Sequence, residues 1–392
     1  IVENLVLGMK QKKSILDTSK TKLMNLKRKL LLLTGMVGLI TAVGHAQVDE
    51  DLTPEEIAYR DSITALNQEN ATIAASQEAY NTGINLFNDK KFEQAIKKFG
   101  ESIQSDPNFT AAYYNKGVAE NEANKFNDAA KTLTTLLEKD PSYSKAYFQR
   151  ARAYQGNGNY LAAENDYKKS IEIEATNPKA HYNYGTLQFL QQDYDGAIKS
   201  FTKTIELKGN GAYAYNDRGS CYRMKGDYPK AIKDYEEAAR KNPALAFVLN
   251  NLGTTKRKMK NYDGAMADFN RAISIDKKFH LAYNNRGATQ MAMNRLDDAL
   301  NDFNKCLEIQ SDYAPAFANI AAVKFKKEDY KGALEAANKA IKLDPNYASA
   351  YVNRGMIKEM LRDMQGACED WSKARELGAE TGKSYYSENC GQ

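Results

Sequence analysis

Small and bulky apolar residues recur along this chain at fixed places in a period of 34 residues. A glycine or alanine begins the pattern nine times, and an alanine follows each one after 12 residues. The first set is Gly83, Gly117, Ala151, Gly185, Gly219, Gly253, Gly287, Ala321 and Gly355. The second set is Ala95, Ala129, Ala163, Ala197, Ala231, Ala265, Ala299, Ala333 and Ala367. A fixed period of this length is typical of a repeat architecture.

Bulky side chains flank the second small residue of each unit. They stand three residues before it at Phe92, Phe126, Tyr160, Tyr194, Tyr228, Tyr262, Leu296, Tyr330 and Met364. Four residues after it stands an aromatic side chain at Phe99, Tyr167, Phe201, Tyr235, Phe269, Phe303 and Trp371. Apolar spacings of three and four predict amphipathic helices. Gly226 and Asp227 suit a helix end and the next N-cap, so each unit is predicted to be two antiparallel helices.

Asn-Pro or Asp-Pro closes several units, at Pro107, Pro141, Pro243 and Pro345. With the Gly, Tyr, Ala, Phe order and the 34-residue period, this pattern resembles the tetratricopeptide repeat over residues 76–381. The resemblance implies an all-α protein, an α-solenoid of antiparallel helix pairs that forms a right-handed superhelix. Pro178 comes three residues late, which predicts a second helix one turn longer before it and Asn177 as the cap of the next helix.

The residues before the repeats predict export. We interpret residues 1–23 as upstream sequence and residues 24–46 as a secretory signal, with a basic start, an apolar run at 30–43 and small residues before Gln47. The run of 14 residues is shorter than the roughly 20 that span a membrane. Cleavage is the preferred interpretation and a retained anchor the alternative. The sequence therefore predicts the periplasm or cell envelope of a bacterium.

Both ends of the repeat array are predicted to be capped. The linker 47–75 contains a capping box at residues 53–56 and an amphipathic helix expected to cover the first repeat. Its apolar residues are Ile57, Ile63, Leu66 and Ile73. Residues 382–392 are expected to cap the other end, because terminal units of a solenoid need a cover.

The charge distribution argues against a nucleic-acid partner. The net charge of +5 comes from residues 1–46, and the remaining residues carry 47 basic and 48 acidic groups. The cysteines Cys221, Cys306, Cys368 and Cys390 lack CxxC spacing, and too few histidines accompany them for a metal site. We interpret all four as buried thiols, with a Cys368–Cys390 disulfide as the alternative.

An arginine recurs at position 7 of four alternate repeats, counted so that the first small residue is position 8. The same repeats carry an aspartate at position 23. The pairs are Arg150 with Asp166, Arg218 with Asp234, Arg286 with Asp302, and Arg354 with Asp370. Both positions lie at equal distances from the turn, so they are predicted to form structural ion pairs across the hairpin. Asp268 is the exception, because Leu252 occupies position 7 of its repeat.

An asparagine recurs at position 6, which in tetratricopeptide repeats faces the concave groove. The seven are Asn81, Asn115, Asn183, Asn251, Asn285, Asn319 and Asn353. Position 5 is aromatic in the first four repeats, at Tyr80, Tyr114, Phe148 and Tyr182. A similar asparagine ladder in O-linked N-acetylglucosamine transferases grips the backbone of an extended polypeptide, which implies that these residues bind a partner. The other interpretation is that asparagine is simply tolerated there.

Basic residues also fall at positions that usually line the groove, at Lys145, Arg152, Lys179, Arg223 and Arg257. An acidic partner segment and a solvated charge distribution are both compatible with them. The carboxylate clamp of chaperone-binding members needs Lys at position 5 and Asn at position 9 of one repeat, and this sequence has no such repeat.

Three classes of function remain. We expect a noncatalytic protein–protein interaction scaffold that binds an extended or helical segment of an envelope or exported protein in its concave groove. The alternative is a structural subunit of a cell-envelope or secretion assembly that uses its convex face and ends. An enzyme is disfavoured, because no nucleophile and base set, metal site or phosphate loop is recognisable. We expect no cofactor, no nucleic acid, no small-molecule substrate and no evident membrane association after signal cleavage.

Overall fold

The computed structural model describes residues 53–209 and 211–390. The predicted upstream segment, the signal segment and residues 47–52 lie outside the described residues. The chain divides into two compact units, one ending at Ala74 and one beginning at Ala75. The second unit contains the whole repeat array.

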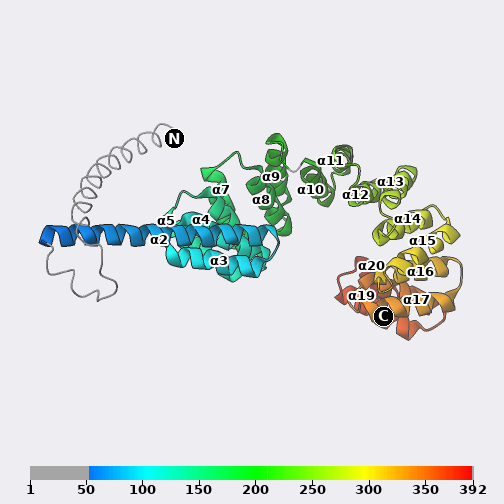
Figure 1. Cartoon of the computed structure of the whole chain (residues 1–392). Helices are drawn as coiled ribbons and strands as arrows, with labels where there is room; N and C mark the ends of the chain where they lie inside the picture. The colour runs from blue at the N-terminus through cyan, green and yellow to red at the C-terminus, as the bar shows by residue number, and fades with distance from the viewer. Residues whose placement is uncertain (1–52, 210, 391–392) are drawn as a thin grey trace. The chain divides into compact units, whose positions relative to one another are not determined.

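Every regular element in the described residues is an α-helix. The helices are α2 (Pro54–Asn88), α3 (Phe92–Ser105), α4 (Thr110–Glu122), α5 (Phe126–Lys139), α6 (Ser144–Gly156), α7 (Tyr160–Ile173), α8 (Pro178–Leu190), α9 (Tyr194–Glu206), α10 (Gly211–Met224), α11 (Tyr228–Lys241), α12 (Ala246–Lys258), α13 (Tyr262–Ile275), α14 (His280–Ala292), α15 (Leu296–Ile309), α16 (Ala314–Lys326), α17 (Tyr330–Leu343), α18 (Ala348–Met360), α19 (Met364–Glu376) and α20 (Glu380–Asn389). They follow one another in consecutive antiparallel pairs (Figure 1). The predicted α-solenoid of helix pairs is confirmed.

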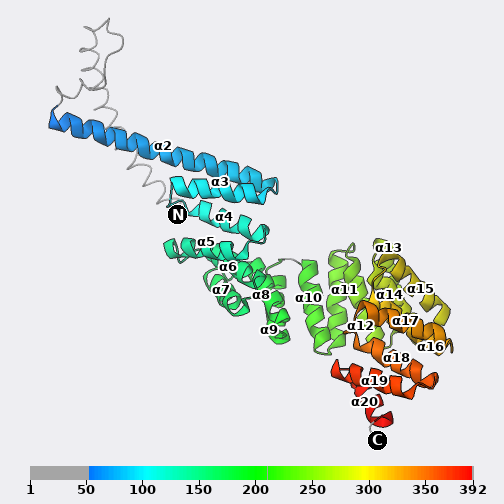
Figure 2. The same cartoon turned by 90° about the horizontal axis from the view of Figure 1, so that it is seen from below.

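The turn inside each repeat forms where the sequence places it. In the fifth repeat Gly226 has a φ of 78°, in the left-handed region that glycine adopts without steric cost. The side chain of Asp227 then accepts a hydrogen bond from the backbone N–H of Lys230 and caps α11. Figure 2 shows the resulting helix pairs in chain order from α10 and α11 to α18 and α19.

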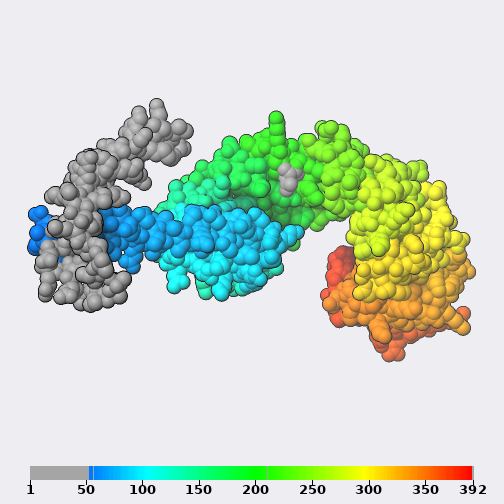
Figure 3. Space-filling model, viewed as in Figure 1, coloured from blue at the N-terminus to red at the C-terminus, as the bar shows by residue number. Residues whose placement is uncertain are grey.

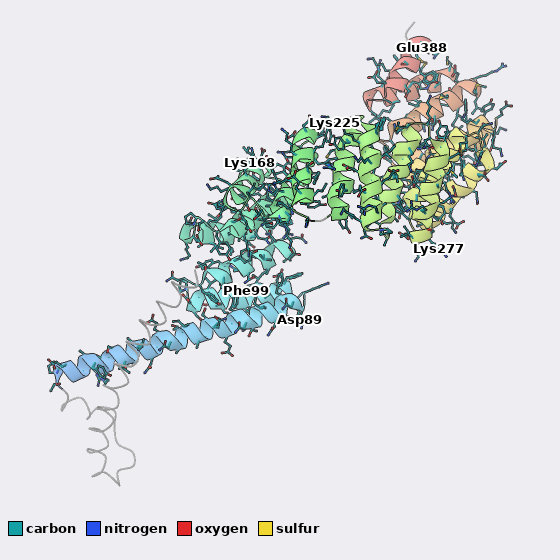
Figure 4. All side chains as sticks on the ribbon, turned by 90° about the horizontal axis from the view of Figure 1, so that it is seen from above. Asp89, Phe99, Lys168, Lys225, Lys277 and Glu388 are labelled. Carbon is teal, nitrogen blue, oxygen red and sulfur yellow. A yellow bond between two sulfur atoms is a disulfide. The ribbon has the colours of Figure 1, made fainter. Side chains whose placement is uncertain are left out.

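The core lies between the two helices of each repeat and continues between neighbouring repeats. All nine alanines of the second set are fully buried, and the aromatic residue four places later packs against the first small residue. A Cβ atom at Gly253 would come within 2.9 Å of the Phe269 ring, so a larger residue there would require the ring to shift. Figure 4 shows Phe99 between the helices, whereas Lys168, Lys225 and Lys277 project from the surface.

Neighbouring repeats contact each other unequally on their two sides. The first helices touch along the row α4, α6, α8, α10, α12, α14, α16 and α18. In the described part of the chain, the second helices of neighbouring repeats make no comparable contact. The first helices are therefore the more closely spaced, and we call their shared surface the inner face. Figure 3 shows the surface passing in chain order from green through yellow to red, as expected for units that contact their neighbours.

One local expectation is wrong. Helix α7 before Pro178 has 14 residues, the same as α5, so the late proline does not lengthen it. Pro178 instead occupies the first turn of α8, where its missing N–H costs nothing, and Asn177 caps that helix as predicted. The helix predicted before the repeats continues into the first helix of the first repeat, because α2 runs unbroken to Asn88.

Helix α2 leaves its predicted apolar stripe largely exposed. Leu66 and Ile73 are 50% and 51% exposed, and Ile63 is 36% exposed. The cover of the first repeat by these residues stays a prediction, and their high exposure does not support it.

Helix α20 closes the array at the other end. Tyr385 stacks on the buried Trp371 with ring centroids 5.2 Å apart, and the Arg375 guanidinium lies 4.3 Å from the Tyr386 ring. A disulfide joins Cys368 to Cys390, with the two Cα atoms 5.7 Å apart. This corrects our preference for four thiols, because only Cys221 and Cys306 are free and buried.

Candidate partner-binding surface

The four arginines at position 7 form the expected ion pairs. Arg218 Nε lies 2.7 Å from Asp234 Oδ2, and its Nη2 lies 2.8 Å from Asp234 Oδ1, which is a bidentate geometry. The pairs Arg150–Asp166, Arg286–Asp302 and Arg354–Asp370 are built in the same way. The hydrogen bond to Asp234 raises the pKa of Arg218. The guanidinium groups of all four arginines are engaged in these ion pairs. They therefore do not form a row of free arginines that could bind a ligand.

Each of these arginines also joins two repeats, which the sequence did not reveal. The Nη1 atom of Arg218 donates to Thr202 Oγ1, 2.9 Å away on the second helix of the preceding repeat. The guanidinium also lies over the ring of Tyr215, 5.4 Å from its centroid. Position 7 is therefore a junction between the hairpin and its neighbour.

The repeat with Leu252 has a different arrangement. Lys256 Nζ lies 2.8 Å from Asp268 Oδ2 and compensates this buried carboxylate in place of the missing arginine. A cavity of about 470 Å³ lies beside Leu252, Lys256 and Asp268.

The asparagine ladder lies along the contacts between first helices. Asn251, Asn285 and Asn319 each donate from Nδ2 to the Oδ1 atom of the asparagine at position 5 of the preceding repeat, over 3.0, 2.9 and 2.9 Å. Asn115 donates to the Tyr80 hydroxyl over 2.8 Å, and Asn353 to the carbonyl oxygen of Ala318 over 3.0 Å. These five residues therefore bind one repeat to the next.

Two members of the ladder lack this contact for a clear reason. Asn183 follows Phe148 at position 5 of the preceding repeat, which has no acceptor, and it donates to the backbone of Lys179 instead. Asn81 accepts a hydrogen bond from Gln77 within α2. A polar side chain at position 5 thus provides the acceptor for Asn115, Asn251, Asn285 and Asn319, whereas Asn353 uses the backbone carbonyl of Ala318.

The aromatic residues at position 5 are mainly packing residues. Phe148 is 9% exposed and belongs to the core around Tyr167, so little of its side chain is accessible to a partner. Tyr80 and Tyr182 pack against Phe99 and Phe201, and Tyr114 packs against Tyr143. Their rings fill the space between helices, because position 5 points into the contact between repeats.

The inner face carries amide oxygens that the fold does not use, and one of these amides, Asn353, lines a cavity. In the described residues, the Oδ1 atoms of Asn251, Asn285, Asn319 and Asn353 accept no hydrogen bond. Between α16 and α18 lies a cavity of about 260 Å³, lined by Ala322, Phe325, Lys326, Asn353 and Met356. Phe325 and Met356 stand at positions 12 and 9 of consecutive repeats and were not predicted as binding residues.

One acidic residue replaces asparagine in the ladder. Asp217 accepts hydrogen bonds from the Tyr182 hydroxyl over 2.6 Å and from Asn216 over 2.9 Å. Burial raises the pKa of this carboxyl group, although the two hydrogen bonds oppose the shift. Asp217 is therefore part of the link between α8 and α10.

A buried glutamate in α4 supports a prediction about pH. Burial raises the pKa of Glu120, and Lys116 at 3.4 Å opposes this only in part. The charged carboxylate therefore costs stability above the pKa of the folded state, and this cost disappears below the pKa of the unfolded state. We expect Glu120→Gln to raise the melting temperature at pH 7 and to have little effect below about pH 4. Glu138→Gln, on the exposed surface of α5, is the control, and an equal or lower melting temperature for Glu120→Gln at pH 7 would contradict the argument.

Comparison with known families agrees with this geometry. Models described as the tetratricopeptide repeat match residues 86–153, 148–212, 212–245, 248–279 and 280–313, and a model described as TPR repeat matches residues 323–360. Together they cover more than half of the chain. The chain belongs to the tetratricopeptide repeat family. Repeats of this family are in general noncatalytic modules for protein–protein interaction.

Solved structures of other tetratricopeptide repeat chains share the fold. A tetratricopeptide repeat protein from Parabacteroides merdae is 22% identical with a TM-score of 0.56, over 63% of this chain and 98% of that chain. A chain of the APC/C hetero-tetramer Cut9-Hcn1 is 17% identical with a TM-score of 0.51, over 77% of this chain and 58% of that chain. At these identities the likeness concerns the fold alone. No curated protein matches the sequence significantly.

The described residues contain neither a cluster of metal ligands nor a membrane-spanning helix. No group of three or more His, Cys, Asp or Glu side chains in residues 53–209 and 211–390 could hold a metal ion. No helix in the same part of this repeat protein is both long and apolar enough to cross a membrane.

Proposed function

We propose that the protein is a noncatalytic scaffold that holds an extended or helical segment of a partner protein on its inner face. The observation that carries this proposal is the cavity between α16 and α18, because it combines an apolar lining with an amide of the ladder. Phe325 and Met356 would receive one apolar side chain of the segment. Asn353 Oδ1 would accept a backbone N–H beside it.

The expected binding free energies favour the cavity together with the asparagine ladder over the ladder alone. Each hydrogen bond contributes roughly 0.5 to 1.5 kcal/mol net, whereas ordering a bound segment costs several kcal/mol. One N–H of each linking amide is already used between repeats, so the ladder offers mainly its carbonyl oxygens. Burial of a leucine-sized side chain contributes roughly 1.5 to 3 kcal/mol, which makes the cavity the anchor.

We also propose export to the periplasm or cell envelope of a bacterium. The order of basic, apolar and small residues in segment 24–46 supports this location. The Cys368–Cys390 disulfide supports it independently, because disulfides persist in oxidising compartments and are rare in the cytosol.

Site-specific photocrosslinking tests the groove. A photoreactive amino acid at Lys326, which lines the cavity, is expected to crosslink a partner in intact envelopes. Met356→Glu places a charge in the cavity, so we expect the crosslink to fall at least tenfold. Met364→Glu is the matched control, since Met364 is 42% exposed at the start of a second helix. The crosslink should survive that change.

The alternative of an assembly subunit predicts a different result. A photoreactive residue at Lys168, on the second helix α7 (Figure 4), would then capture the partner, and Met356→Glu would leave that capture unchanged. Strong crosslinks from Lys168 with none from Lys326 would reject the groove proposal.

A further inference from the structure

A recurring contact joins the end of the first helix to the aromatic residue of the second. In the third repeat the Tyr167 hydroxyl donates to Gln155 Oε1 over 2.8 Å. In the fifth repeat the Tyr235 hydroxyl lies 3.0 Å from Ser220 Oγ and accepts from Arg223 Nε over 3.3 Å. A tyrosine hydroxyl at position 24 thus contacts position 12 in the third repeat and positions 9 and 12 in the fifth.

The sixth repeat keeps the polar residues and loses the hydroxyl. Thr254 and Arg257 occupy positions 9 and 12, but position 24 is Phe269. The Oγ1 atom of Thr254 and the Nε atom of Arg257 are both buried without a hydrogen-bond partner. They are one helical turn apart on α12, so a single substitution accounts for both unsatisfied donors. Buried donors without a partner are rare and require an explanation.

The charge of Arg257 is also uncompensated. No carboxylate forms an ion pair with Arg257 in the described residues, unlike the four arginines at position 7. Burial lowers the pKa of the Arg257 guanidinium. An arginine remains charged in proteins, so an incoming anion would recover the lost interaction.

The place of these residues connects them to the inner face. Ala322 and Phe325 stand at the same positions of the eighth repeat and line the cavity between α16 and α18. Two repeats earlier along the chain, the equivalent residues are therefore Thr254 and Arg257.

We propose that Thr254 and Arg257 bind a carboxylate of the partner segment that lies on the inner face. This inference rests on the proposed function and adds a chemical requirement to it, an acidic group on the segment about two repeats from its apolar anchor. The guanidinium would bind the two carboxylate oxygens, and the threonine hydroxyl would donate to one of them. Both residues are only partly buried, so rotation of the two side chains brings their donors to the groove.

A carboxylate has two sources in a polypeptide, an acidic side chain and a C-terminus. Three short acetylated glycine peptides separate them: one amidated with a central aspartate, one with a free C-terminus, and one amidated with a central asparagine. NMR of the protein labelled with isotopic arginine reports the Nε–H signal of Arg257, assigned with Arg257→Lys. We expect saturable shifts with a carboxylate peptide and none with the asparagine peptide, and the tighter carboxylate peptide identifies the source.

Phe269→Tyr is the decisive variant, because it restores the hydroxyl that satisfies the fifth repeat. We expect it to weaken carboxylate binding at least tenfold without loss of thermal stability. Tyr235→Phe is the reciprocal control and should make Arg223 respond to the same peptides. Equal shifts in Phe269→Tyr and the natural protein, or an equal response to the asparagine peptide, would overturn the proposal.

Partner binding at the cavity and carboxylate binding at Thr254 and Arg257 can be rejected independently of each other. Peptide shifts at Arg257 without a crosslink from Lys326 would reject partner binding at the cavity and retain the carboxylate site. A crosslink from Lys326 that persists while no carboxylate peptide shifts Arg257 would reject the site alone.

Discussion

Replacement of Arg218 by alanine is expected to lower the free energy of unfolding by roughly 3 to 5 kcal/mol, because it leaves a buried carboxylate without its partner. Asp234 has only 6% of its side chain exposed, and Arg218 has 18%. Asp234→Ala should cost a similar amount, and the double variant should cost less than the sum of the two. Urea unfolding followed by circular dichroism measures all three differences.

The control separates the two contacts of Arg218. Thr202→Val removes only the hydrogen bond to the preceding repeat, so we expect a loss of about 1 kcal/mol. Strictly additive losses for Arg218→Ala and Asp234→Ala would show that the two side chains do not act as a pair. The 2.7 Å contact would then contribute little to stability.

The repeat pattern allowed the fold to be predicted because close packing leaves few choices at its key positions. A Cβ atom at Gly287 would come within 2.8 Å of the Phe303 ring, so the small residue and the aromatic residue specify each other. The pairing of Arg286 with Asp302 followed from the same symmetry, since positions at equal distances from a turn meet across the hairpin.

The error at Pro178 has a simple cause. A proline in the first turn of a helix and a proline just beyond a helix end have similar sequence surroundings. In this chain Pro178 and the unit-closing Pro243 both follow an asparagine. Only the observed cap, in which Asn177 accepts from the N–H groups of Lys179 and Ala180, distinguishes them.

The roles of the ladder could not be predicted from one position considered alone. Whether an asparagine at position 6 is a link or a binding group depends on position 5 of the preceding repeat, 35 residues before it. Asn216 precedes Asn251 with an acceptor, whereas Phe148 precedes Asn183 without one. Comparison of these two positions would have identified the links between side chains, but not the bond from Asn353 to the backbone carbonyl of Ala318.

The unsatisfied donors of the sixth repeat could not be recognised from the aromatic pattern. Phenylalanine and tyrosine are equivalent for packing at position 24, and both fit the pattern. They differ in one hydroxyl, which matters only because Thr254 and Arg257 lie next to Phe269.

Reduction of the Cys368–Cys390 disulfide is expected to destabilise helix α20 by roughly 3 kcal/mol, the value for closing a loop of about 20 residues. The last helix of a repeat array contacts only one neighbour, so it opens locally before the array unfolds. Hydrogen exchange at the backbone amides of Tyr385 and Tyr386 measures this opening. We expect exchange about a hundredfold faster in the presence of reductant.

The matched control is Cys368→Ser with Cys390→Ser, in which exchange at α20 should be fast and should not respond to reductant. Amides of α12 should exchange equally slowly in all samples, because reduction leaves the interior repeats intact. The stacking of Tyr385 on Trp371 sets the stability that remains. If exchange at Tyr385 and Tyr386 stays slow after reduction, this packing rather than the disulfide holds the last helix in place.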